Sequence, residues 1–303
     1  MTIMGMIKIL TDSCGDLGKE TREIYDIDYC RMNTQYDGKE TPASLDWEYY
    51  TPKSLYDIMR DGNRVFTTMV PTEEFVNVFG KYAGEGYDII YIGCSLKQSG
   101  SVNVAKTVAR DVMKIYPDVK IHCIDSKHAS TGEGMIAIRA AEYRDQGLDA
   151  DTIAKKVEED LKYCHEFCTV HTLDCLKRAG RVKASSAFFG NLLGVKPIII
   201  ADAEGDQTAI KKVKGRKAAL DEIVDLLAEA VVDSEDQTLF ISHADCLDEA
   251  EYVKKRMEEK IPCKEIRIEY MGPIIGSSIG PSGMAVFGWG KEITFKSGDK
   301  YEQ

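Results

Sequence analysis

At 303 residues, of which 44% are hydrophobic, the chain is long enough for about two globular domains. Its formal net charge of -11 argues against a nucleic-acid-binding protein, which normally presents a basic face. No run approaches the ~18 apolar residues of a membrane helix, and the start of the chain lacks a signal-peptide pattern. The nine cysteines are odd in number and follow no disulfide-scaffold spacing. We therefore expect a cytoplasmic protein without integral membrane contact.

The first half of the chain alternates strand-like and helix-like segments. Strands are predicted over Met6–Leu10, Tyr87–Ile92 and Lys120–Ile124, and helices over Pro52–Arg60, Pro71–Lys81, Ser101–Lys114 and Gly134–Gln146. This alternation is typical of an α/β domain, in which helices cover a parallel sheet. The segment Thr34–Tyr50 interrupts the pattern, and its Asp37-Gly38 turn signal predicts a short hairpin or an irregular loop.

The second half mixes helices with a strand hairpin. Helices are predicted over Ala150–Tyr163, Leu173–Ala179, Arg216–Val232 and Leu247–Lys260, and strands over Glu166–Leu173, Lys196–Ala201, Gln207–Lys214, Thr238–Ser242, Glu265–Tyr270, Ala285–Trp289 and Glu292–Phe295. The turn at Glu204-Gly205-Asp206 makes the third of these strands a hairpin partner of the second. We therefore predict an N-terminal α/β domain over residues 1–160 and a C-terminal α+β domain with a mixed sheet over residues 161–303.

Hydroxyl-rich turns follow several of the short apolar runs. They contain Thr67, Thr68, Ser95, Ser99, Gly100 and Ser101. Ligands of open parallel sheets bind outside the carboxyl ends of the strands, so these turns predict a pocket for a polar head group. Backbone N–H groups of Ser99-Gly100-Ser101 could also face an anion. The alternative is helix capping, for example by Ser101.

Two further segments suit an anionic group. The Gly- and Ser-rich segment Gly276–Gly283 predicts either an anion-binding loop or a tight crossover between strands. The basic cluster Lys177–Lys183 would attract a carboxylate or phosphate if it lay near a pocket. Alternatively, the cluster has no ligand and Arg178 simply interacts favourably with a helix C-terminus. This explanation applies less to Arg181, which lies beyond that helix.

Motifs for catalysis and metal binding are weak. The chain has neither a Gly-x-Ser-x-Gly elbow nor a Walker A loop. Asp125–His128 contains Asp, Ser and His, but residues so close in sequence cannot easily form a triad. The residues Cys164, His165, Cys168 and His171 lack the distant second pair of a zinc finger. We therefore expect a protein that is not an enzyme and holds no metal.

Five motifs in order resemble the DegV family of bacterial fatty-acid-binding proteins, which includes the acyl-binding subunits of fatty-acid kinase. They are Ile9–Leu17, Phe66–Phe75, Ser95–Ser101, Ile124–Lys127 with Gly132-x-Gly134, and Leu173–Val182 followed by Gly190–Ile198. The resemblance extends over nearly the whole chain. The last of these motifs is the most distinctive.

The resemblance implies a long-chain fatty acid in a tunnel between the two domains, with no cofactor. Hydroxyl groups hold its carboxyl group, and a partner fatty-acid kinase phosphorylates that group. Where the family commonly has a His in its closing loop, this chain has Ser278. The expected carboxyl-binding residues are Thr67, Thr68, Ser95, Ser99, Gly100 and Ser278. Arg181 and Ser277 are expected near the head group or a partner.

A second hypothesis is a phosphotransferase subunit that acts on a small hydroxy substrate. It rests on the similarity of the DegV fold to dihydroxyacetone kinase domains. A phosphate or metal site within the chain would favour it, but the sequence shows neither a P-loop nor a clear carboxylate pair for Mg²⁺.

Overall fold

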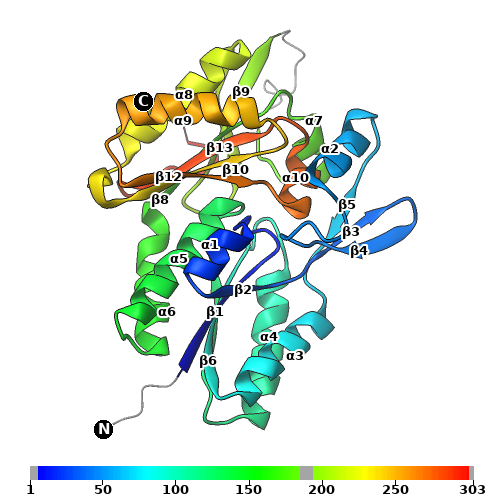
Figure 1. The fold of residues 1–303 in the computed structure, drawn as a ribbon, viewed down its shortest axis with the longest axis vertical. Helices are drawn as coiled ribbons and strands as arrows, with labels where there is room; N and C mark the ends of the chain where they lie inside the picture. The colour runs from blue at the N-terminus through cyan, green and yellow to red at the C-terminus, as the bar shows by residue number, and fades with distance from the viewer. Residues whose placement is uncertain (1–5, 185–193, 300–303) are drawn as a thin grey trace.

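The computed structural model describes residues 6–184 and 194–299 and shows two stacked α/β layers (Figure 1). The N-terminal sheet is entirely parallel, as predicted. Its strand order is β2 (Ile27–Cys30), β1 (Met6–Asp12), β6 (Tyr87–Gly93) and β7 (Ile121–Asp125). The short helix α1 (Lys19–Ile24) joins β1 to β2 and was not predicted.

Helices cover both faces of this sheet because its strands carry apolar residues on both sides. One core contains Leu10 and Tyr91 with α3 (Thr72–Gly84) and α4 (Ser101–Ile115). The other contains Ile9 and Ile92 with α5 (Thr131–Asp145) and α6 (Ala150–Asp160). Successive residues of a strand point to opposite faces, so β1 and β6 contribute to both cores.

Of the hairpin or irregular loop predicted for residues 34–50, the structure shows a hairpin that begins at Asn33. It consists of β3 (Asn33–Tyr36) and β4 (Lys39–Pro42), joined by Asp37 and Gly38 at φ 50° and 68°. Two positive φ values are typical of the tight turns that match strand twist. The unpredicted strand β5 (Phe66–Thr68) pairs with β3 and places Thr67 and Thr68. Helix α2 (Pro52–Arg60) has the predicted bounds and begins at a Thr51 cap.

The C-terminal sheet is mixed, as predicted. Its strand order is β10 (Gln207–Lys214), β9 (Val195–Ala201), β8 (Cys164–Thr169), β13 (Met284–Trp289), β11 (Thr238–His243) and β12 (Glu265–Tyr270). Among the strand pairs of this sheet that the structure describes, β11–β12 is parallel and the other four are antiparallel. Helices α8 (Arg216–Ala230) and α9 (Leu247–Lys260) cover its outer face. Two short helices, α7 (Asp174–Ala179) and α10 (Pro273–Ile279), pack on one another near α2.

Two sequence predictions in this domain are wrong. Residues 292–295 are not a strand, because Ile293 donates to Lys162 O whereas Phe295 O accepts from Ala203 N in a different segment. The predicted loop at 276–283 begins within α10, which ends at Gly280 with φ 82°. Pro273 at the first helical position explains this helix start. Gly190, within the last motif, lies outside the described residues.

Helix α5 joins the two domains. Most of its residues are buried because one face packs on the N-terminal sheet and the other on the inner face of the C-terminal sheet. A helix that is buried on all sides packs closely against neighbouring elements on each of its faces. Helix α6 ends at Asp160, and β8, the first strand of the C-terminal sheet, begins at Cys164.

Substitution of Gly134 in α5 by Ala is expected to destabilise the protein by about 1–3 kcal/mol. A Cβ at this position would lie 2.5 Å from Gly15 O and 2.6 Å from Leu17 Cδ2. The matched control is Gly80→Ala in α3, where a Cβ meets nothing within 4 Å. Higher helix propensity should stabilise that variant by up to about 1 kcal/mol. Urea unfolding measures the change in the free energy of unfolding in both variants. Equal changes would contradict the close packing of α5.

Candidate functional site

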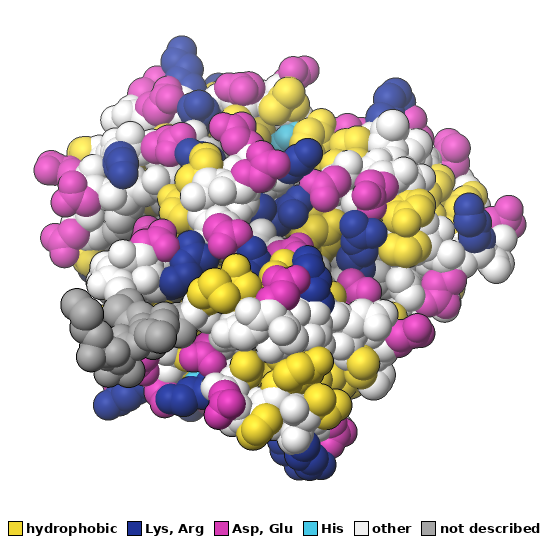
Figure 2. Space-filling model, turned by 60° about the horizontal axis from the view of Figure 1, so that its bottom comes forward, with side chains coloured by type: hydrophobic (Ala, Val, Ile, Leu, Met, Phe, Trp, Pro, Cys, Tyr) yellow, Lys and Arg dark blue, Asp and Glu magenta, His cyan; other side chains and the backbone are white. Residues whose placement is uncertain are grey.

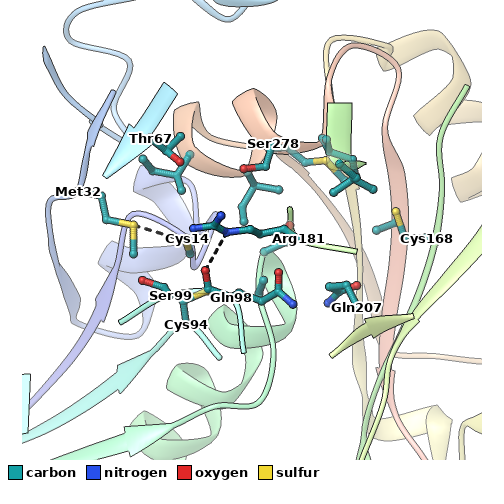
Figure 3. Close-up of a pocket in the computed structure, with 18 of the residues that line it drawn as sticks. Cys14, Met32, Thr67, Cys94, Gln98, Ser99, Cys168, Arg181, Gln207 and Ser278 are labelled. Atoms are coloured by element: carbon teal, nitrogen blue, oxygen red, sulfur yellow. Dashed lines mark hydrogen bonds between the residues drawn. The ribbon is translucent and has the colours of Figure 1, made fainter. Parts of the chain in front are cut away.

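A cavity of about 340 Å³ is lined by residues from both domains (Figure 3). Its volume is in the range of small-molecule pockets. Apolar side chains dominate the lining, among them Met32, Met69, Leu176, Ile199, Ile274 and Ile279. A cavity of this character suits a ligand that is mostly hydrocarbon.

Polar groups from four segments meet in this cavity. Thr67 and Thr68 come from β5, Ser99 and Gly100 from the loop just before α4, Ser278 from α10, and Arg181 from the segment after α7. Figure 3 shows the Arg181 side chain extending between Thr67 and Ser278 on one side and Ser99 on the other. The structure therefore brings together five of the six residues expected to bind a carboxyl group, and Arg181 with them.

The hydrogen bonds of Ser99 leave its hydroxyl group able to donate. Ser99 Oγ accepts from Ser101 N at 3.3 Å and lies 2.9 Å from Ser101 Oγ, which itself accepts from Val70 N at 3.2 Å. When Ser101 donates to Ser99, the Ser99 hydrogen is free to point into the cavity. Gly100 is the N-cap residue of α4 and Ser101 its first residue, so the positive end of this helix faces the same place.

Thr68 provides a second unused group. Its Oγ1 is buried without a hydrogen-bond partner among the described residues, although the residue lines the cavity. Buried polar groups of native proteins are nearly always hydrogen-bonded. Because water cannot reach this oxygen in the structure, the hydroxyl group would contact a ligand only after the Thr68 side chain rotates.

Arg181 is held at the cavity by the chain on both sides of it. Helix α7 ends at Gly180 with φ 70°, a left-handed conformation that favours glycine. Arg181 Nη1 donates to Ala179 O at 2.6 Å, and its Nε donates to Gln98 O of the other domain at 3.1 Å (Figure 3). The guanidinium group is thus a positive charge fixed beside Ser99.

Ser95 and Ser277 are placed differently from the other hydroxyl residues. Ser95 is fully buried, and its Oγ donates to Gly205 O at 2.8 Å. Gly205 has φ 88°, and a Cβ there would lie 2.5 Å from Ser95 Oγ, so this contact locks the two domains together. Ser277 Oγ donates to Pro273 O within α10 at 2.6 Å and lines a smaller neighbouring hollow. Neither side chain lines the main cavity.

The sequence predictions missed four polar residues of the cavity wall, Gln98, Ser130, Glu166 and Gln207. Glu166 Oε2 accepts from Gln207 Nε2 at 3.2 Å. Burial raises the pKa of Glu166 to about 7, although the Gln207 hydrogen bond lowers it. The available signal was strand alternation, because Glu166 shares a face with Cys168, which also lines the cavity.

Sulfur and carboxylate groups meet at the N-terminal side of the cavity. Cys14 Sγ, Cys94 Sγ and a carboxylate oxygen of Glu133 lie within 4.8 Å of one another, and all three residues are buried. A hydrogen bond with Cys94 and burial raise the pKa of Cys14, and burial raises that of Glu133. Protonated groups are poor metal ligands. In the part of the chain that is described, the four residues Cys164, His165, Cys168 and His171 form no comparable group.

The surface is mixed in charge. Figure 2 shows acidic side chains spread over the visible face with basic ones between them, in agreement with the net charge of -11. Among the described residues, none of the helices has the length and apolarity that a membrane crossing requires.

Fold and site together define a two-domain α/β protein with an apolar cavity between its domains and hydroxyl and guanidinium groups at one part of it. The model of the DegV family, described as uncharacterised proteins, matches residues 6–290, and the chain belongs to this family. The resemblance drawn from the five motifs is confirmed.

Similar proteins support this assignment over nearly the whole chain. A DegV domain-containing protein of Clostridium perfringens is 36% identical over 280 residues, which cover 92% of this chain and 96% of that protein. A DegV lipid binding protein from Thermotoga maritima has a TM-score of 0.84 at 25% identity, covering 95% and 100% of the two chains. DegV of Bacillus subtilis, a fatty acid binding protein, has a TM-score of 0.79 at 26% identity and the same coverage.

Proposed function

We propose that this protein binds a long-chain fatty acid in the cavity between its domains. Thr67, Ser99 and Ser278 donate hydrogen bonds to the carboxylate beside Arg181, and the acyl chain occupies the apolar part. The observation that carries the proposal is the meeting of hydroxyl groups, a guanidinium group and an apolar wall in one cavity. Each buried CH₂ contributes about 0.8 kcal/mol, so the chain supplies most of the affinity.

The head-group region offers what a buried carboxylate requires. A carboxylate removed from water needs hydrogen-bond donors and a compensating charge. The Ser99 hydroxyl group and Arg181 supply both, and the start of α4 adds a favourable dipole. The fatty acid is the ligand, and the proposal needs no cofactor. The B. subtilis relative, described as a fatty acid binding protein, supports the same ligand class.

We also propose that the protein presents the carboxyl group to a partner kinase in the cytoplasm and does not itself catalyse the transfer. Next to the main cavity lies a smaller hollow that shares Thr67, Arg181 and Ser278 with it and adds Arg64 and Arg178. Guanidinium groups are well suited to phosphoryl oxygens. A phosphoryl group transferred to the carboxyl would therefore meet positive charge. The nine free cysteines fit a reducing compartment.

Calorimetric titration of delipidated protein tests the binding proposal. Stearic acid should bind with a stoichiometry of one per chain, whereas methyl stearate, which has the same chain but no carboxylate, should bind more weakly. Equal affinity for acid and ester would contradict carboxylate recognition. If neither compound produces a binding signal in the titration, lipid binding itself is contradicted.

Ser278→Ala is expected to weaken stearic acid binding by about 1 kcal/mol, because it removes one donor at the carboxylate. Its control is the neighbouring Ser277→Ala, since the Ser277 hydroxyl already donates within α10. The same titration measures both. Equal losses in the two variants would mean that α10 acts through its fold and not through Ser278.

A further inference from the structure

The C-terminal sheet places a hydrogen-bonding pair in the apolar wall of the cavity. Glu166 of β8 and Gln207 of β10 line it together with Cys168, Ile199 and Ala285. Strand alternation directs Glu166 and Cys168 inward, whereas Phe167 between them packs in the outer core with α8. The pair is therefore part of the inner face of the sheet, which α5 and the cavity share.

This pair lies apart from the groups proposed to hold the carboxylate. In Figure 3, Gln207 and Cys168 lie to the right of the Arg181 guanidinium group, whereas Met32, Thr67 and Ser99 lie to its left. Glu166 is held at Gln207 by the 3.2 Å hydrogen bond between Gln207 Nε2 and Glu166 Oε2. A ligand whose carboxylate is at Ser99 would reach the pair only with its chain.

The pair is poorly suited to a plain hydrocarbon chain. Glu166 is 6% and Gln207 9% exposed, and both residues line the cavity. Methylene groups that cover this surface would exclude water and offer no hydrogen bond in return. A chain with a hydroxyl group at this point could donate to the Glu166 carboxyl or accept from the Gln207 amide.

We propose, on the basis of the proposed function, that the preferred ligand is a fatty acid with a hydroxyl group along its acyl chain, bound by Glu166 and Gln207. A site built to hydrogen-bond a ligand hydroxyl discriminates strongly against the analogue that lacks it. Glu166 and Gln207 thus determine which acyl chain is accepted, whereas the hydroxyl groups at Thr67 and Ser99 recognise only the carboxylate that all fatty acids share.

Competition against a fluorescent fatty acid tests this specificity with delipidated protein. The competitors are stearic acid and hydroxystearic acids with the hydroxyl group in the middle or at the end of the chain. At least one hydroxystearic acid should bind the unmodified protein about tenfold more tightly than stearic acid. Glu166→Leu should reverse this order by binding stearic acid more tightly, a gain that misfolding cannot imitate. Thr169→Val, on the same strand but outside the cavity lining, should keep the original order.

The two proposals fail in different ways. If stearic acid binds as tightly as every hydroxystearic acid and Glu166→Leu leaves the ratio unchanged, hydroxyl recognition is overturned while fatty-acid binding stands. If none of these acids displaces the probe, both proposals are overturned.

Discussion

Ser99→Ala is expected to bind stearic acid about 1–3 kcal/mol more weakly than the unmodified protein. Ser99 Oγ accepts from Ser101 N and lies 2.9 Å from Ser101 Oγ, so its own hydrogen is available to the ligand when Ser101 is the donor between the two hydroxyl groups. Without it, one carboxylate oxygen in an apolar cavity lacks a donor, which is costly because a buried charge needs partners. Calorimetric titration of the delipidated variant measures the loss.

The control is Ser95→Ala in the same loop. Ser95 is fully buried and donates to Gly205 O, so its loss should lower the stability of the domain contact but leave stearic acid affinity within about 0.5 kcal/mol. Unchanged affinity in Ser99→Ala would remove Ser99 from the head-group site. A loss in Ser95→Ala as large as in Ser99→Ala would assign the effect to loop geometry.

Glu166→Gln is expected to change how stability depends on pH. The pKa of Glu166 is raised from 4.5 to about 7, chiefly by burial, so the folded state favours the protonated carboxyl. Protonation of Glu166 therefore stabilises the folded state fully below pH 4.5, and this stabilisation is lost as the pH rises to about 7. The Glu166→Gln variant cannot titrate at this position. Relative to it, the free energy of unfolding of the unmodified protein should fall by about 3 kcal/mol over this pH range.

Urea unfolding of ligand-free protein at intervals between pH 4 and pH 8 measures this difference. Comparison with the variant cancels the buried carboxyls of Asp12, Asp16 and Glu133, whose pKa values burial also raises. The exposed Glu158→Gln serves as a control and should parallel the unmodified protein. Parallel curves for Glu166→Gln as well would show that water reaches Glu166 freely in the folded state.

The sequence predicts the architecture well where the pattern is local. Helix α2 was predicted with correct bounds because Thr51 and Pro52 mark its start, and α9 and β12 because apolar periodicity spans each whole element. Strand β5 escaped prediction since its pairing with β3 depends on a partner more than thirty residues away. Residues 292–295 have a strand-like composition, but their backbone bonds go to two separate segments.

The candidate site was predictable in part. Thr67, Ser99 and Ser278 follow from turn position and motif order, and all three line the cavity. Ser95 has the same sequence signal as Ser99, but only the approach of Gly205 from the other domain reveals its partner. Glu166 was missed because a glutamate in a strand is ordinarily at the surface, and only the packing of the sheet on α5 makes this one part of the cavity wall.

Mass spectrometry of an organic-solvent extract of the purified, folded protein tests the central claim most directly. We predict a fatty acid at about one molecule per chain, and a smaller amount in the extract when Thr67 and Ser99 are replaced together by Val and Ala. A well-folded protein whose extract contains no lipid, and which takes up no fatty acid when one is added, would contradict the account.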